Sequence, residues 1–364
     1  METEQKPKNK SFLLKIVLGL IGVATIFLAV YFRAEIFNKP KKASVEGLKI
    51  SVEEKEPAGL TVPQLDTAAY DSKLLAIANN PTLATTTSSA PQYLWPVKTV
   101  YPNAGAILPF KRIVAYYGNL YSKNMGVLGE YSEEVVLQKL AGEVNKWQAA
   151  DPETPVIPAL HYIAVVAQAG PGKDGKFRAR MPDKEIDKVL KMAEKINALV
   201  FLDIQVGLSN VQTEIPLLEK YLKMANVHLG IDPEFSMKSG ARPGTEIGTL
   251  DAADVNFAAE YLAKIVRENN LPPKVLVIHR FTQKMLTNYS EIKPLPEVQL
   301  VMNMDGFGGR GSKLNTYKQY IYKQPVQLTG FKLFYKNDAR AAGGMLEPEG
   351  LLKLNPIPVY IQYQ

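Results

Sequence analysis

The chain has 364 residues, a formal net charge of +7 and a hydrophobic content of 46%, which together allow one large folded domain with appended segments. The positive charge is diffuse and forms no basic stripe interleaved with aromatic residues, so no nucleic-acid partner is expected. The absence of cysteine excludes disulfide bonds, thiolate catalysis, cysteine metal ligands and a lipid-modified cysteine.

The N-terminus carries a predicted membrane anchor. Residues 16–32 form an uncharged run that, with the flanking residues from 11 onward, is long enough to cross a bilayer. A cleaved signal peptide is the alternative, but Tyr31, Phe32 and Arg33 make a poor small-residue cleavage site. We therefore expect a cytoplasmic tail over residues 1–10, a single-pass anchor over residues 11–33 and an extracytoplasmic remainder, which places the protein in the cell membrane.

Residues 34–107 have the composition of a linker. They lack apolar periodicity and are rich in proline, threonine and serine. A short helix over residues 66–78 fits the pattern, and Trp95 is expected to pack onto the folded domain. Such a linker would hold the domain away from the membrane or let it reach into a cell wall.

From residue 108 to 364, apolar strand-like runs alternate with longer amphipathic segments, which is the rhythm of parallel strands joined by helical crossovers. The eight predicted strands begin at residues 112, 155, 198, 227, 274, 298, 329 and 357. The predicted helices span residues 132–149, 183–196, 213–224, 252–269, 314–322 and 347–354. The connection between the fifth and sixth strands is short and poorly helical.

Eight strands in about 250 residues predict an α/β fold, a (β/α)8 TIM-like barrel over residues 108–364. The last strand reaches the C-terminus, so the final helix is missing, and we expect the segment around Trp95 to cover the gap. An open doubly wound sheet is the alternative, but the turn after the first strand lacks the glycine-rich phosphate-binding sequence of that fold.

Polar side chains collect where the predicted strands end, which is where such a barrel builds its active site. The expected catalytic acids are Asp203, Asp232, Glu234 and Asp305. The expected substrate-binding residues are Tyr116, Tyr117, His161, Gln205, His279, Arg280, Asn303, Tyr335 and Gln362. The histidines fit a structural role equally well, the arginine would also serve to neutralise the acids, and only one of the two consecutive tyrosines is expected to point inward.

The carboxylates are the strongest chemical signal in this set. Acids crowded into one barrel mouth raise some of their pKa values, so that one carboxyl stays protonated while its neighbours are ionised. Glycoside hydrolysis uses that division of roles. Glu234, nearest the rim, is the expected proton donor, and Asp232, on the same face of its strand, is expected to orient or stabilise.

Residues 232–234 (DPE) and 302–305 (MNMD) resemble two motifs of the family 18 chitinase-type glycoside hydrolases, Asp-x-x-Asp-x-Asp-x-Glu at the end of strand 4 and Met-x-Tyr-Asp in strand 6. In that family the glutamate is the acid and the neighbouring aspartate positions the substrate N-acetyl group. The resemblance implies these roles for Glu234 and Asp232.

The match to these motifs is partial. Val227 and Gly230 stand in place of the two earlier aspartates, and Met304 replaces the tyrosine. The resemblance therefore covers the acid, its neighbouring aspartate and the aspartate of strand 6.

Several longer segments, including PALHYIAVVAQ, HLGIDPEF, KVLVIHRFT and MDGFGG, are similar to a group of uncharacterised bacterial exported proteins. Members of that group carry a glycoside-hydrolase-like barrel behind a lipobox, a signal peptide or an anchor. This resemblance implies a fold and a location and does not imply a substrate.

The sequence favours a membrane-anchored extracytoplasmic barrel that binds a cell-wall or environmental glycan and hydrolyses it by carboxyl acid/base chemistry, without a cofactor. A non-catalytic glycan-binding or envelope-structural barrel is the alternative, so turnover is left open. A metal-dependent hydrolase is a third reading, with ligands of the right type in His161, Asp203, Asp232, His279 and Asp305. No two of these ligands form a tight pair within one motif, so no metal is expected.

Two long loops, residues 168–182 and 236–250, follow the second and fourth predicted strands. They are rich in glycine, proline and basic residues and could cover the acidic mouth as a lid. Arg178, Arg180 and Arg242 would then recognise an acidic substrate group, with solvated loop charges as the alternative.

Overall fold

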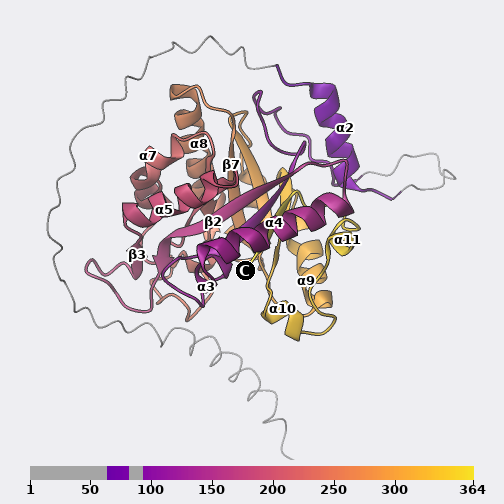
Figure 1. Cartoon of the computed structure of the whole chain (residues 1–364). Helices are drawn as coiled ribbons and strands as arrows, with labels where there is room; N and C mark the ends of the chain where they lie inside the picture. The colour runs from indigo at the N-terminus through magenta and orange to yellow at the C-terminus, as the bar shows by residue number, and fades with distance from the viewer. Residues whose placement is uncertain (1–63, 82–92) are drawn as a thin grey trace, which may run out of the picture. The chain divides into compact units, whose positions relative to one another are not determined.

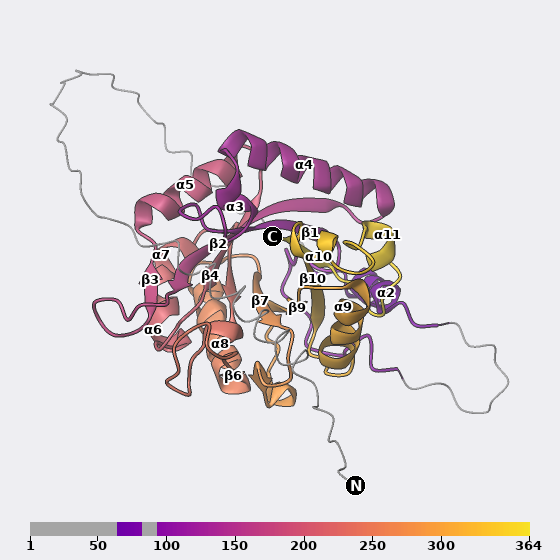
Figure 2. The ribbon, with the colours of Figure 1, turned by 90° about the horizontal axis from the view of Figure 1, so that it is seen from below.

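Parallel strands close into a barrel. The computed structural model describes residues 64–81 and 93–364. Its main sheet has the order β1-β11-β10-β9-β7-β5-β4-β2-β3, and β1 also pairs with β2, so every strand except the added β3 belongs to a closed ring. All pairings in that ring are parallel. The predicted TIM-like barrel is confirmed, and Figure 2 shows the strands enclosed by helices.

Each of the predicted strands has a counterpart in the ring. The ring strands are β1 (Arg112–Gly118), β2 (Val156–Ala167), β4 (Leu199–Ile204), β5 (Val227–Ile231), β7 (Lys274–Arg280), β9 (Val298–Met304), β10 (Leu328–Leu333) and β11 (Tyr360–Tyr363). Outside the ring, β3 (Arg178–Arg180) pairs antiparallel with β2, and β6 (Leu250–Asp251) pairs with β8 (Leu286–Thr287). The ring strands are buried on both faces, which is why they read as continuous apolar runs.

Three long helices form where the sequence predicts them (Figure 1). They are α4 (Glu133–Ala150), α5 (Asp183–Glu194) and α8 (Ala252–Glu268). Two glutamates in the first turn of α4 favour its N-terminal end electrostatically. A capping box formed by Asp251 and Asp254 fixes the start of α8.

The other connections are shorter or more irregular than predicted. The helix expected over residues 213–224 is divided into α6 (Val211–Glu214), the 3-10 turn η1 (Ile215–Leu218) and α7 (Glu219–Leu222), because Pro216 has no amide hydrogen to continue the α-helical pattern. The helix α9 (Arg310–Thr316) runs into a π-helical segment, η4 (Tyr317–Tyr322). The remaining short elements are α3 (Val127–Glu130), η2 (Pro233–Phe235), η3 (Tyr289–Glu291), α10 (Asn337–Arg340) and α11 (Pro348–Leu351).

Alternate residues of each strand point outward onto the helices or inward into the barrel. The outward residues form the larger hydrophobic core with the helices. The inward residues of the amino-terminal half form a second apolar cluster that includes Ile113, Phe201, Val275, Val301 and Tyr360. The carboxyl-terminal half of the interior is left to polar side chains.

The helix α2 (Thr67–Ala78) covers the apolar end of the barrel. Its Leu74 and Ile77 pack against the inner apolar cluster, and the Ile77 carbonyl accepts a hydrogen bond from Ile357 N at 2.7 Å. The helix expected over residues 66–78 is thus confirmed. Trp95 is buried as expected, and its indole N–H donates to Tyr322 O at 2.9 Å, which places it against η4; its covering of the gap after β11 stays a prediction.

The predicted tail and anchor, residues 1–10 and 11–33, lie outside the described residues, as do residues 34–63 and 82–92 of the predicted linker. Among the described residues, no helix has both the length and the apolar character that a membrane crossing requires. The anchor and the domain boundaries therefore stay predictions.

Candidate active site

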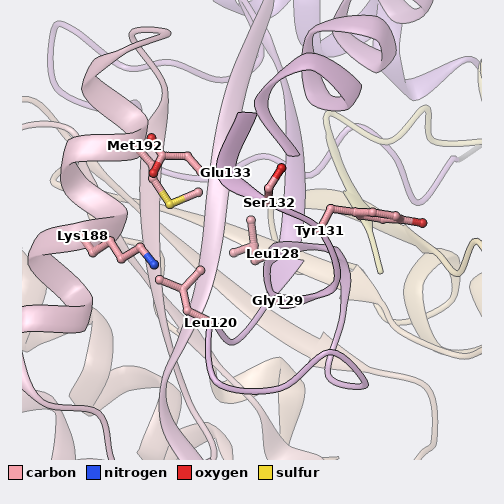
Figure 3. Close-up of a pocket in the computed structure, with 8 residues that line it drawn as sticks. All are labelled: Leu120, Leu128, Gly129, Tyr131, Ser132, Glu133, Lys188 and Met192. Carbon is pink, nitrogen blue, oxygen red and sulfur yellow. The ribbon is translucent and has the colours of Figure 1, made fainter. Parts of the chain in front are cut away.

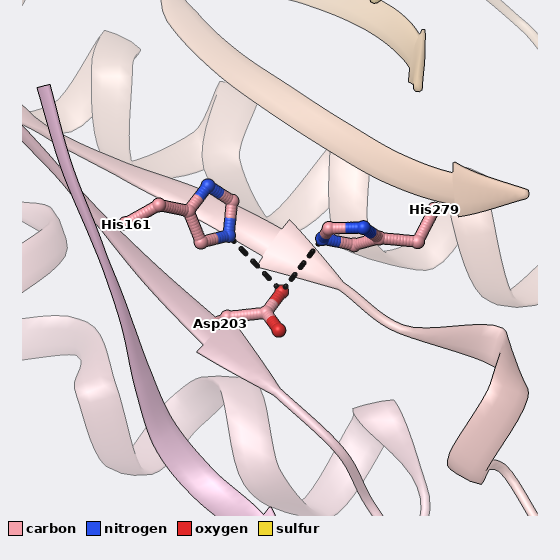
Figure 4. A group of neighbouring side chains, drawn as sticks. All are labelled: His161, Asp203 and His279. Atoms are coloured by element: carbon pink, nitrogen blue, oxygen red, sulfur yellow. Dashed lines mark ion pairs between the residues drawn. The ribbon is translucent and has the colours of Figure 1, made fainter. Parts of the chain in front are cut away.

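A connected set of charged side chains fills the carboxyl-terminal half of the barrel interior. Its centre is Asp203 on β4, whose side chain is fully buried. The Oδ1 atom of Asp203 lies 3.2 Å from His161 Nε2 and 3.4 Å from His279 Nε2, as Figure 4 shows. The Tyr117 hydroxyl donates a hydrogen bond of 2.9 Å to Oδ2. Side chains from β1, β2, β4 and β7 thus meet at one carboxylate.

The set continues through Asp305 to Lys332. Asp305 Oδ2 lies 2.8 Å from His279 Nδ1, and its Oδ1 lies 2.9 Å from Lys332 Nζ. The Lys332 ammonium also sits 3.8 Å from the centre of the Tyr117 ring, a cation–π contact. We call His161, Asp203, His279, Asp305 and Lys332 the charge cluster.

The charges in this cluster balance one another. Burial opposes a charge on His279, but the carboxylates of Asp203 and Asp305 outweigh it and raise the pKa of this imidazole to about 10. Burial lowers the pKa of His161 to about 4 although Asp203 pulls it upward, so that ring is neutral. Burial also opposes ionisation of the two aspartates, yet His279 beside Asp203 and Lys332 beside Asp305 hold their pKa values low.

Above the cluster, the end of β5 presents two further acids. Asp232 is buried, and its Oδ1 accepts a hydrogen bond of 3.0 Å from Glu234 N, which starts the turn η2. Its Oδ2 accepts one of 3.2 Å from Gln205 Nε2. The Glu234 side chain is partly exposed, and no described residue forms a hydrogen bond or an ion pair with its carboxyl group. Asp232 therefore orients the turn that carries Glu234.

The pKa values of these two acids are raised, whereas those of Asp203 and Asp305 are held low. Burial, reinforced by the charges of Asp232 and Asp305, raises the pKa of Glu234 to about 8. Burial likewise raises the pKa of Asp232 to about 7, with His279 opposing the shift and Asp203 adding to it. At neutral pH, Glu234 is a protonated acid next to ionised carboxylates, which is the arrangement that acid catalysis by a carboxyl group requires.

The glycine at position 230 follows from the packing of this cluster. A Cβ atom on Gly230 would lie 2.3 Å from Asp203 Oδ1 and 2.4 Å from His161 Nε2, so no side chain fits there. The family 18 motif has an aspartate at this position of β5. Here the carboxylate of Asp203, reaching over from β4, occupies that space.

Three of the predicted substrate-binding residues point away from the cluster. The Tyr116 hydroxyl lies 2.9 Å from the Tyr335 hydroxyl, which itself donates to Glu143 on α4 at 3.0 Å. Arg280 is fully buried and donates to backbone carbonyls of the segment from the end of β7 to β8 and of η4. Strand alternation explains the outward placement of Tyr116 and Arg280, because the adjacent residues Tyr117 and His279 take the inward positions.

The remaining predicted residues lie inside the barrel. Gln205 joins Asp232 to Tyr117, to whose hydroxyl it donates at 3.4 Å. Gln362 donates to the Tyr360 hydroxyl at 3.0 Å, and Asn303 is fully buried with neither side-chain polar atom hydrogen-bonded to a described residue. The structure thus gathers all four acids with two histidines, Tyr117 and Gln205.

Two arginines of the expected lid are already paired. Arg178 and Arg180 both donate to the buried carboxylate of Glu214, at 2.8 Å and 2.7 Å. Both guanidinium groups are therefore engaged with Glu214, and their recognition of an acidic substrate group stays a prediction. Arg242 is exposed on its loop.

Lys332 is the cluster residue that sequence reasoning missed. It lies in the apolar run of β10, where burying a lysine at an inward position costs free energy unless the ammonium group is paired. That context was the available signal. Its partner Asp305 directly follows the neighbouring strand β9, at a separation along the chain that no local pattern reveals.

A pocket on the helical layer is separate from this site. It has a volume of about 130 Å³ and is lined by residues in and beside α3, α4 and α5, among them Tyr131, Lys188 and Met192 (Figure 3). None of the charge-cluster residues lines it. The candidate site is therefore the charge cluster and the acids at the barrel mouth, and this pocket is not part of it.

No protein-family model matches the sequence, and no curated protein matches it. A solved structure that the fold is similar to is the crystal structure of a GH18 chitinase from Pseudoalteromonas aurantia, at 11% sequence identity and a TM-score of 0.33, over 70% of this chain and 94% of that chain. This is a weak likeness, so the barrel assignment rests on the strand pairing. Fold and site define a (β/α)8 barrel with a buried charge cluster and a partly exposed acid at its mouth.

Proposed function

We propose that the barrel mouth binds a glycan and cleaves a glycosidic bond, with Glu234 as the proton donor. The observation that supports this most strongly is the state of Glu234 itself. Of the four candidate acids it alone is partly exposed, and its pKa is raised to about 8. A carboxyl group that is both reachable and protonated at neutral pH can donate its proton to a leaving-group oxygen.

The neighbouring residues support this role from below. Asp232 orients the turn that carries Glu234 through the hydrogen bond to Glu234 N. The negative charges of Asp232 and Asp305 disfavour ionisation of Glu234 and so help to keep it protonated. Asp203 and Asp305 hold His279 between their carboxylates and thereby fix the floor of the site.

The expected substrate is a cell-wall or environmental glycan. This part of the proposal relies on the sequence, in which an apolar run at residues 16–32 precedes a linker-like segment. A barrel held outside the membrane by a single-pass anchor would meet such polymers, with the membrane as its second partner. The resemblance of residues 232–234 and 302–305 to chitinase-type motifs points to the same class of substrate.

A non-catalytic glycan-binding or envelope-structural barrel is the second candidate. Its support is the pairing within the charge cluster, because Asp203, His279, Asp305 and Lys332 are all buried and already satisfy one another electrostatically. Charges neutralised in this way can serve the fold alone. Under this candidate, the mouth would bind a glycan and leave it intact.

One experiment separates the two candidates. The full-length chain is tested for binding and for turnover against the same panel of oligosaccharides and peptidoglycan fragments. Turnover supports the proposed hydrolase. Binding without turnover supports the second candidate, and neither binding nor turnover across the panel contradicts both.

A further inference from the structure

Three buried polar atoms converge at the centre of the charge cluster. They are His161 Nε2, Asp203 Oδ1 and His279 Nε2, all within 4.8 Å of one another (Figure 4). The two contacts to Asp203, at 3.2 Å and 3.4 Å, are close enough for ion pairs. Neither contact has the geometry of a hydrogen bond, and none of the three atoms has a hydrogen-bond partner among the described residues. Buried polar atoms usually have a hydrogen-bond partner, so these three atoms are free to bind one common ion.

The other polar atom of each side chain is held in place from outside the trio. His161 Nδ1 lies 2.6 Å from the Tyr360 hydroxyl, and Asp203 Oδ2 accepts the hydrogen bond from Tyr117. His279 Nδ1 lies 2.8 Å from a carboxylate oxygen of Asp305, an ion-pair contact without hydrogen-bond geometry. Binding of a metal ion by Nε2 would release the proton that His279 carries between the two carboxylates.

We propose that His161, Asp203 and His279 bind one divalent transition-metal ion of the zinc type. Two imidazole nitrogens and one carboxylate oxygen are ligands that zinc prefers. Ligands at tetrahedral positions around zinc lie about 3.4 Å apart, close to the two contacts of 3.2 Å and 3.4 Å that Asp203 Oδ1 makes with the histidines. The outer contacts of Tyr360, Tyr117 and Asp305 match the second shell that commonly orients metal ligands.

The sequence offers ligands of the right type for this site but no tight spacing between them, because they come from β2, β4 and β7 and lie far apart along the chain. It lies on the inward strand positions just below Asp232, where the absence of a side chain at Gly230 lets Asp203 and His161 approach each other. The proposal is independent of glycan cleavage. An ion at this point would stabilise the base of the barrel mouth whether or not Glu234 transfers a proton.

The test is a metal titration of the full-length chain after removal of bound metals with a chelator. Cobalt(II) serves as the spectroscopic probe and zinc(II) as its competitor. We expect one equivalent of cobalt to give the visible absorption of a low-coordinate nitrogen and oxygen site, zinc to displace it, and zinc to raise the Tm. Absence of stoichiometric binding by the wild-type chain overturns the proposal without any variant.

Variants then locate the ion. We expect His161→Gln to abolish stoichiometric binding and Tyr117→Phe, which removes an outer contact, to weaken it about 10-fold. His228→Gln is the matched control, since His228 is also buried inside the barrel but is not part of the trio, and it should bind like wild type. Equal binding by the His161→Gln and wild-type chains assigns the ion to another place and overturns the proposal. If His161→Gln does not fold, the comparison of Tyr117→Phe with His228→Gln decides in the same way.

Discussion

The two halves of the barrel interior shift the pKa of a buried histidine in opposite directions. His228, on β5 in the apolar amino-terminal half, is buried beside Phe201 and has its pKa lowered by burial and by the charge of Lys274. His279, on the adjacent strand β7 in the carboxyl-terminal half, is equally buried but has its pKa raised to about 10 by Asp203 and Asp305. Burial alone therefore does not set the charge of a histidine here; its carboxylate neighbours do.

The two halves of the barrel interior also differ in how they are stabilised. The amino-terminal half is closed by packing, with Leu108 and α2 lying against the inner apolar cluster. The carboxyl-terminal half retains buried charges whose desolvation has to be offset by close pairing. Natural proteins commonly keep such arrangements at functional sites, where stability is given up for chemistry.

Breaking the charged half should have the largest effect. The variant Asp203→Asn removes a carboxylate that contacts both histidines and is expected to lower the free energy of unfolding by about 3 to 5 kcal/mol, because a buried imidazolium loses one of its two counter-ions. Urea unfolding measures this change. The exposed pair Lys264–Glu268 provides the control, and Glu268→Gln should cost under about 0.5 kcal/mol. Similar costs for the two variants would show that the charge cluster is not tightly paired.

Adding a side chain at Gly230, where the charge cluster leaves no room, should lower the stability of the fold slightly less. Gly230→Ala forces a Cβ against Asp203 and His161 and is expected to destabilise the fold by about 3 kcal/mol. Gly142→Ala is the control, because a Cβ there meets nothing within 4 Å and alanine favours the helix α4. Thermal unfolding of both variants checks the pair. A Gly230→Ala variant as stable as wild type would mean that the cluster has room to move.

The smallest stability effect should come from Glu234, and it should depend on pH. Since the unfolded value is 4.5 and the folded pKa is about 8, the folded chain holds a proton that the unfolded chain has lost between these values. The stability of wild type therefore falls as pH rises through this window, and glutamine at position 234 does not share the fall. We expect Glu234→Gln to be about as stable as wild type near pH 4.5 and more stable by about 1 to 2 kcal/mol at pH 9.

Measured by urea unfolding across pH, the exposed Glu134→Gln variant should show no such trend and serves as the control. A constant difference between Glu234→Gln and wild type at all pH values would contradict the raised pKa. The same result would remove the main support for Glu234 as an acid.

The strands, and which of their side chains point into the barrel, could be predicted from the sequence, because both depend on local alternation. The apolar runs mark the strands, and parity within β5 places His228, Gly230 and Asp232 on one inward face. The order of eight runs along the chain then predicts the barrel.

Contacts between strands could not be predicted in this way. The meeting of His161, Asp203 and His279 depends on ring closure, which brings three separate strands to a common centre. The pairing of Arg178 and Arg180 with Glu214 likewise depends on where a loop folds back onto the barrel. Local patterns carry no information about such distances.

The pH dependence of glycan turnover tests the proposed role of Glu234 as the proton donor most directly. With any glycan that the wild-type chain cleaves, kcat/KM should decline as pH rises through about 8, because Glu234 loses its proton there. Glu234→Gln should lower kcat/KM by at least about 100-fold at neutral pH, while Glu134→Gln leaves it unchanged. Turnover by Glu234→Gln at the wild-type rate would contradict the account.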